Sequence, residues 1–277
     1  MDLVFSDIHA DIDALDTILD ISSSKEFTKK YGSFSRLINL GDLLERGAYP
    51  KLVLTKMKSL EKNYKLFSVM GNHDEAFLYK RKVSGSSFES LEAHELLDND
   101  DLSFFKENKD GTFGRQEFID IKNGLFCVHG GPLDPKKITP AGSNESWLYQ
   151  RTWQRLTEED FEFFSNSGYH YMASSAFQEV KKKVRDHIIF AGHQHLETVI
   201  VNNSKITEIY SKIKPKHQKI SRFIIESREI EIEPANNYLI RVGIGGPAGY
   251  YGGGFSNPHF AIVEYNPKKV ILFTVKT

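Results

Sequence analysis

Seven side chains that can bind a divalent metal ion stand at five places in the chain. They are Asp7, His9, Asp42, Asn72, His129, His193 and His195. A mixed set of nitrogen and oxygen donors suits Zn, Mn, Fe or Ni better than Ca. Seven ligands exceed what one tetrahedral ion needs, whereas two ions that share a bridging carboxylate would use them all. Two divalent ions about 3.5–4 Å apart are the usual arrangement for hydrolysing phosphate esters.

Each of the five places follows a short apolar run that is typical of a buried strand. These runs cover residues 3–5, 37–40, 66–69, 125–128 and 188–190. Because ligands collect beyond the carboxyl ends of strands in open α/β sheets, we expect the five loops to converge on one site. The alternative is a set of unrelated, solvated loop residues. A single Asp-x-His pair would not exclude it, but five such places after five predicted strands favour one metal centre.

The segments between these places are expected to be helices and insertions within a single domain that covers residues 1–277. Apolar residues at helical spacing predict helices over residues 11–21 and after Pro50. Two helical insertions, either of which could form a cap over the site, are expected at residues 83–110 and 133–183. The second has helical stretches around 157–166 and 173–184.

The last part of the chain, from about residue 196 onward, alternates short β-prone runs with turn residues. This pattern predicts a second, mostly antiparallel sheet packed on the first. The glycine-rich run 249–254 predicts a loop that could flank the site.

Composition narrows the partners and the compartment. The chain has 277 residues and a net charge of −1, so no overall basic field indicates nucleic acid as a partner. The single cysteine, Cys127, excludes an intramolecular disulfide and suits a reducing compartment. The sequence shows no secretory signal and no apolar run near the roughly 18 residues of a membrane span, so we expect a cytoplasmic protein without membrane contact. The oligomeric state is left open.

The order of the motifs resembles one family. The motifs are Asp7-Ile8-His9, Gly41-Asp42-Leu43-Leu44-Glu45-Arg46-Gly47, Gly71-Asn72-His73-Asp74, Val128-His129-Gly130-Gly131 and Gly192-His193-Gln194-His195. Together they resemble the calcineurin-like metallophosphoesterases over residues 3–195. The resemblance implies an α/β fold, a four-layer αββα sandwich of two mixed β-sheets flanked by helices, with a dinuclear metal centre between the sheets.

The resemblance also implies how the ligands divide between two divalent ions. One ion would take Asp7, His9 and His195. The other would take Asn72, His129 and His193, with Asp42 bridging both. Manganese is the expected metal, with Fe, Zn or Ni as alternatives.

Different motifs resemble different branches of this family. The motifs around Arg46 and His129 are similar to those of the serine/threonine protein phosphatase and bis(nucleosyl) tetraphosphatase branch, whereas Gly192–His195 is similar to the wider family. The leading hypothesis is therefore hydrolysis of a phosphomonoester, either a phosphoprotein or a small phosphorylated metabolite. A phosphodiesterase or dinucleoside polyphosphate hydrolase with the same metals is the alternative. A non-catalytic scaffold is a third hypothesis, although such a protein would be expected to lose ligands or His73.

Three further kinds of residue are candidates for the chemistry. A metal-bridging hydroxide would attack phosphorus, and His73 would protonate the leaving oxygen, with Asp74 or Asp7 orienting its ring. Arg46, four residues after the bridging carboxylate, would bind the phosphate through its planar guanidinium. Arg151 is a second candidate for phosphate binding. The alternatives are a helix-terminal role for His73 and a surface salt bridge for Arg46.

Overall fold

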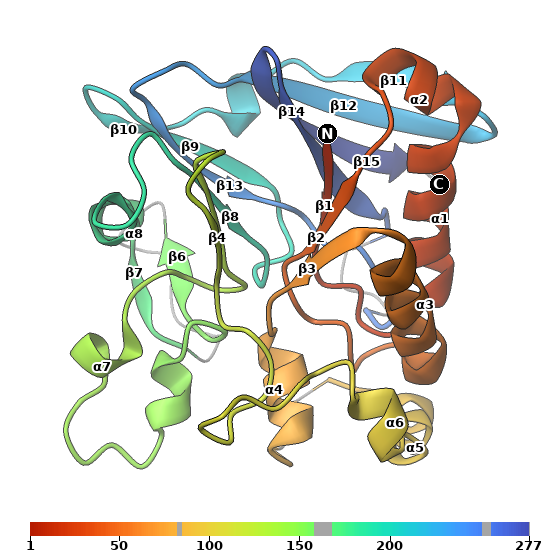
Figure 1. The fold of residues 1–277 in the computed structure, drawn as a ribbon, viewed down its shortest axis with the longest axis vertical. Helices are drawn as coiled ribbons and strands as arrows, with labels where there is room; N and C mark the ends of the chain where they lie inside the picture. Colours follow the sequence, from red (N-terminus) through yellow and green to blue (C-terminus); the bar gives the residue numbers. More distant parts are fainter. Residues whose placement is uncertain (82–84, 158–167, 251–255, 277) are drawn as a thin grey trace.

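The computed structural model describes residues 1–81, 85–157, 168–250 and 256–276. Within these ranges the chain forms two large β-sheets, and helices lie on both outer faces of the pair (Figure 1). The predicted four-layer αββα sandwich is therefore confirmed. No helix in the described ranges combines the length and the apolarity of a membrane span.

The larger sheet has seven strands in the order β11-β12-β15-β14-β1-β2-β3. In chain order these strands are β1 (Asp2–Phe5), β2 (Arg36–Asn39), β3 (Lys65–Ser68), β11 (Lys216–Ile220), β12 (Phe223–Glu231), β14 (His259–Tyr265) and β15 (Lys268–Lys276). β1, β2 and β3 are mutually parallel, so their carboxyl ends meet at one edge of the sheet.

The second sheet has six strands in the order β10-β9-β13-β8-β5-β4. In chain order these strands are β4 (Phe118–Asp120), β5 (Leu125–Cys127), β8 (Ile188–Ala191), β9 (Thr198–Asn202), β10 (Ile206–Glu208) and β13 (Asn237–Arg241). β5 and β8 run parallel, as do β8 and β13. A small separate sheet pairs β6 (Arg155–Thr157) with β7 (His170–Met172).

Residues of the central strands alternate between two cores, because successive side chains on a strand point to opposite faces. In β1, Leu3 belongs to the core under the helices, whereas Val4 belongs to the core between the sheets. In β8, Ile188 faces the other sheet and Ile189 belongs to the core beneath α8 (Ala173–Lys181). Burial on both faces explains why these strands are continuous apolar runs in the sequence.

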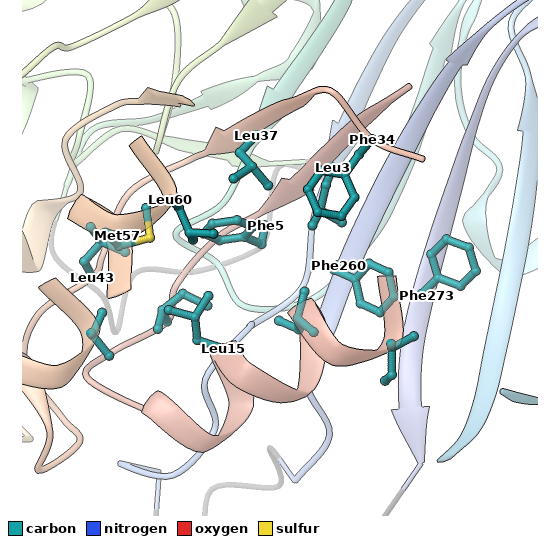
Figure 2. Close-up of a cluster of buried hydrophobic side chains, with 14 of the residues drawn as sticks. Leu3, Phe5, Leu15, Phe34, Leu37, Leu43, Met57, Leu60, Phe260 and Phe273 are labelled. Atoms are coloured by element: carbon teal, nitrogen blue, oxygen red, sulfur yellow. The ribbon is translucent and has the colours of Figure 1, made fainter. Parts of the chain in front are cut away.

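The seven-stranded sheet is covered by α1 (Ile12–Ser23), α2 (Lys25–Tyr31) and α3 (Pro50–Asn63), and α8 lies on the opposite side of the molecule (Figure 1). Figure 2 shows Leu15 of α1 and Met57 of α3 beside Phe5 of β1 in the core under these helices. Asp11 caps α1 by accepting a hydrogen bond from the Ala14 N–H at 3.0 Å. Both helices predicted near the N-terminus are confirmed.

The two predicted insertions contain several short elements. In residues 83–110 these are α5 (Phe88–Glu95) and α6 (Asn99–Leu102), which follow α4 (Asn72–Leu78). In residues 133–183 they are α7 (Pro135–Ile138), a 3₁₀ turn η1 (Ser146–Tyr149), β6, β7 and α8; a second 3₁₀ turn, η2 (Tyr210–Lys212), comes later. Helix α8 matches the helix predicted at 173–184, whereas the stretch at 158–166 lies outside the described residues. The single-domain division and the insertions stay predictions.

The prediction of a separate sheet from about residue 196 onward is wrong. Strands β11, β12, β14 and β15 extend the sheet of β1, while β9, β10 and β13 extend the sheet of β8. β14 pairs antiparallel with β1, and β13 pairs parallel with β8. A β-prone run indicates that a strand forms, but tertiary contacts decide which strand it pairs with.

Candidate metal centre

The seven predicted ligands lie at the carboxyl ends of parallel strands from both sheets. Asp7, His9, Asp42 and Asn72 follow strands of the seven-stranded sheet; His129, His193 and His195 follow strands of the six-stranded sheet. The structure brings all of them together. Five have left-handed backbone conformations with φ between 49° and 67°: Asp7, His9, Asp42, His193 and His195. Such strained residues cluster at functional sites, where the surrounding structure maintains them.

One group consists of Asp7, His9 and His195. The Nε2 atoms of His9 and His195 lie 3.3 Å apart, and His195 Nε2 lies 3.4 Å from Asp7 Oδ1. His9 Nε2 lies 3.9 Å from the same carboxylate oxygen. Two imidazole nitrogens and a carboxylate oxygen therefore face one another, and their potential ligand atoms lie within 4.8 Å. This group fits one divalent cation.

The second group consists of Asn72, His129 and His193. Asn72 Oδ1 lies 2.9 Å from His129 Nε2 and 2.7 Å from His193 Nδ1. The other nitrogen of His129, Nδ1, lies 2.8 Å from the Leu40 carbonyl oxygen, which orients the ring so that Nε2 points into the group. An amide oxygen and two imidazole nitrogens fit a second divalent cation.

Asp42 lies between the two groups. Its Oδ2 is 3.8 Å from His9 Nε2 and 3.2 Å from His129 Nε2, one ring from each group. The side chain is buried, yet this oxygen has no hydrogen-bond partner among the described residues. Its other oxygen, Oδ1, accepts the His73 backbone N–H at 2.8 Å. The position and the lack of a partner fit a carboxylate that bridges two cations.

The charge states of the group suit metal binding. Burial opposes ionisation of Asp42, but His129 and His73 hold the pKa of its carboxyl well below the usual range. Burial holds the pKa of His9 well below its usual value, and burial together with Arg155 does the same for His193. Although burial lowers the pKa of His129, Asp42 raises it to about 9. His9 and His193 are thus neutral ligands, while His129 would release a proton on binding a cation.

Comparison with known families gives the same assignment as the site geometry. The sequence model of the calcineurin-like phosphoesterase family matches residues 3–197, which include all seven converging side chains. The chain belongs to this family. Members of the metallophosphoesterase superfamily are hydrolases, and this chain has clusters of side chains that are candidate ligands for divalent metals. A comparison with curated proteins finds no match.

Solved structures share the fold at low sequence identity. A metallophosphoesterase from Sphaerobacter thermophilus is 20% identical in sequence and has a TM-score of 0.59. The match covers 99% of this chain and 88% of that chain. A hypothetical protein from Pyrococcus horikoshii OT3 is 15% identical and has a TM-score of 0.56, and the match covers 100% of this chain and 88% of that chain. A serine/threonine phosphatase from Saccharomyces cerevisiae is 16% identical and has a TM-score of 0.54, and the match covers 100% of this chain and 80% of that chain.

His73 lies beside the ligands of this calcineurin-like site, as the sequence predicts. Its ring is 4.9 Å from that of His9, centroid to centroid. Its Nδ1 lies 2.7 Å from Glu45 Oε2. Among the described residues, Glu45 is thus the carboxylate that orients His73, and the expectation that Asp74 or Asp7 does so is corrected. Glu45 lies between Asp42 and Arg46 of the sequence motif, but spacing alone gave no reason to choose it.

Asp74 has a backbone role. Its carboxylate accepts the N–H groups of Asp42, Leu43 and Leu44, each at 2.9 Å, and that of Gly71 at 3.1 Å. Burial and the charge of Asp42 raise the pKa of Asp74 to about 7, against the effect of these hydrogen bonds. This arrangement joins the loops after β2 and β3 and gives Asp74 a structural role, while the catalytic role predicted for it stays a prediction.

Arg46 lies next to the first ligand group, together with a tyrosine that the sequence did not single out. The Arg46 guanidinium lies 4.9 Å from the centroid of the Tyr250 ring. The Tyr250 hydroxyl is 3.0 Å from His9 Nε2 and 3.2 Å from His195 Nε2. The glycine-rich run thus reaches the site at Tyr250, while residues 251–254 of this run lie outside the described residues.

Arg155 is charge-coupled to the candidate ligands, whereas Arg151, the predicted second phosphate-binding residue, pairs with Glu117. Arg151 Nε lies 3.3 Å from Glu117 Oε2, and its guanidinium is thereby engaged in an ion pair. Arg155 at the start of β6 lies in the field of Asp42 and Asp7, which raise its pKa; burial and Arg241 nevertheless lower it to about 10. The two arginines belong to one short run of sequence, and only tertiary contacts distinguish them.

Proposed function

We propose that this family member is a two-metal phosphatase that hydrolyses phosphomonoesters of a phosphoprotein or of a small phosphorylated metabolite. Asp42 carries this proposal, since its buried Oδ2 lies between the two ligand groups without a hydrogen-bond partner among the described residues. A buried carboxylate is unfavourable unless its charge is compensated, and two cations would compensate it. Manganese is the proposed metal, while Fe, Zn and Ni accept the same donors.

The chain's residues would divide the work of binding as their positions indicate. Asp7, His9 and His195 would hold one ion, and Asn72, His129 and His193 the other, with Asp42 shared. When bound, the ions supply an activated water and neutralise charge on the phosphoryl oxygens. Arg46 and Arg155 would bind phosphoryl oxygens from the protein side.

His73 would act on the leaving oxygen. Its Nδ1 is engaged by Glu45, so Nε2 is the nitrogen that exchanges a proton with this oxygen. A carboxylate on one ring nitrogen fixes the orientation of the other, as in other acid–base pairs. The proton moves from His73 to the departing alkoxide as its bond to phosphorus breaks.

A substrate panel tests the proposed function. Metal-free protein, loaded with Mn²⁺, is assayed on p-nitrophenyl phosphate and on bis(p-nitrophenyl) phosphate. We expect metal-dependent release of nitrophenol from the monoester at a kcat/KM well above that for the diester. Turnover of the diester alone would overturn the monoesterase proposal and favour a phosphodiesterase or a dinucleoside polyphosphate hydrolase. Turnover of neither substrate would count against the enzymatic proposal.

The two arginines give a matched pair of variants. We expect Arg155→Ala to raise KM for the monoester about 10- to 100-fold, because charge-assisted hydrogen bonds to phosphate contribute roughly 1.5–3 kcal/mol. Arg151→Ala removes the ion pair with Glu117 but keeps the Arg151 carbonyl that accepts the Gly130 and Gly131 N–H groups. Its KM should change less than about twofold. Steady-state kinetics decide, and the reverse order of effects would contradict the assignment.

A further inference from the structure

The turn formed by Glu45 and Arg46 carries two groups of the proposed active site on unusual backbone. Glu45 has φ of 65° and Arg46 has φ of 71°, so two consecutive residues with side chains adopt left-handed conformations. Each such residue is disfavoured by roughly 1–3 kcal/mol and persists only where the surroundings hold it. Contacts outside the turn must therefore hold it in place. Its position matters because Glu45 contacts His73 and the Arg46 guanidinium lies beside the Tyr250 ring.

One segment holds both backbone N–H groups of this turn. The Glu45 N–H donates to His94 Nε2 at 2.7 Å, and the Arg46 N–H donates to Ser86 Oγ at 3.3 Å. Both acceptors lie in residues 85–94, at the start of the predicted insertion 83–110. The segment also touches the Arg46 side chain, since a Cβ added at Gly85 would lie 1.5 Å from Arg46 Nη1.

The tautomer and the burial of His94 favour its hydrogen bond with the Glu45 N–H. Its Nδ1 lies 2.7 Å from the Ser90 carbonyl oxygen, which can only accept, so Nδ1 carries the proton and Nε2 is the acceptor. The side chain is 4% exposed, and burial lowers its pKa, which favours the neutral ring. Beside His94 lies a cavity of about 830 Å³, lined by Phe77, Leu97 and Leu102 among others. The hydrogen bond to Glu45 thus bears directly on the position of the turn.

We propose that residues 85–94 position the Glu45–Arg46 turn, and that His94 is a positioning residue for proton transfer to the leaving group. The inference rests on the proposed function, since it assigns His94 a role in the same site. In this proposal His94 fixes the Glu45 backbone through its hydrogen bond with the Glu45 N–H. The Glu45 carboxylate in turn orients His73, and His73 protonates the leaving oxygen. Among the described residues, His94 contacts Glu45, Ser90 and Phe77, none of which is a candidate metal ligand.

The test compares His94→Leu with His94→Gln in the full chain. Leucine fills similar space among apolar neighbours but accepts no hydrogen bond, whereas glutamine offers an oxygen to the Glu45 N–H. The substrates are glycerol 2-phosphate, whose alkoxide needs a proton to leave, and p-nitrophenyl phosphate, whose phenolate leaves without one. We expect His94→Leu to lower kcat about tenfold for glycerol 2-phosphate and less than about threefold for p-nitrophenyl phosphate. The tenfold loss is a part of the roughly 10²- to 10⁴-fold rate enhancement that a general acid contributes. His94→Gln should restore most of the loss.

Two other results would overturn the inference. Equal losses on both substrates would show a merely structural role, and so would a failure of glutamine to recover the alkyl phosphatase activity. A second measurement does not depend on turnover: the ¹⁵N NMR resonances of His94 in the wild-type protein should report a protonated Nδ1 and a bare Nε2. Protonation at Nε2 excludes the contact with Glu45. Absence of wild-type hydrolysis would refute the proposed function, and the NMR result would still decide the contact.

Discussion

Asp42→Asn should lower kcat for phosphomonoester hydrolysis by roughly 10³-fold, because several kcal/mol of metal-dependent charge stabilisation are lost. Asparagine keeps an oxygen for the His73 N–H, which Asp42 Oδ1 accepts at 2.8 Å. It removes the charge and puts an uncharged N–H₂ group in the place of Oδ2, the atom between His9 and His129. Metal content measured by elemental analysis should fall together with kcat.

The control for this change is Asp20→Asn, which removes an exposed carboxylate from α1. It should leave kcat and metal content unchanged. Unchanged turnover in Asp42→Asn would contradict the two-metal proposal and revive the hypothesis of a non-catalytic scaffold. Loss of turnover with full metal content would place Asp42 in the chemistry but not in metal binding.

Asp74→Ala should be the most destabilising single substitution considered for this site. Four backbone N–H groups that now donate to the carboxylate would be left without it inside the protein. A buried unsatisfied donor costs about 1–3 kcal/mol, so we expect a loss of roughly 4 kcal/mol or more in the free energy of unfolding. The midpoint of urea unfolding, followed by tryptophan fluorescence, measures it.

Two comparisons make this prediction specific. Asp74→Asn keeps one acceptor oxygen and should fall between the wild type and Asp74→Ala. Asp110→Ala removes an exposed carboxylate that accepts the Thr112 N–H, and its unfolding midpoint should hardly move. A midpoint for Asp74→Ala equal to that of the wild type would show that water replaces the carboxylate at these N–H groups.

The convergence of the seven candidate ligands could be predicted from the sequence, because each follows an apolar run whose end is visible. Leu3 to Phe5 predicts a strand, and Asp7 must then lie just beyond its carboxyl end. The pairing of the strands was harder to predict from the sequence. β14 joins the sheet of β1 across more than 250 residues of chain, and no local pattern carries that information.

The residues around the metals were harder to predict than the ligands for the same reason. Arg151 and Arg155 have equal chemistry and near-equal positions in sequence. Their contacts differ because Glu117, on another segment, pairs with Arg151. Tyr250 reaches the site from a run whose glycines predict only a loop, and its contact with His9 depends on the whole fold. Glu45 lies within the motif, but its contact with His73 likewise depends on how the loops after β2 and β3 are placed.

The division of the ligands between the two sheets has a mechanical consequence. Asp7 and His9 come from one sheet and His195 from the other, and the second group is divided likewise between Asn72 and the two histidines. Neither binding site exists in a chain that has formed one sheet alone. Bound ions would thus link the two sheets. A chain in which only one sheet had formed would have no complete hydrolytic centre. We therefore expect metal-dependent activity only in completely folded molecules.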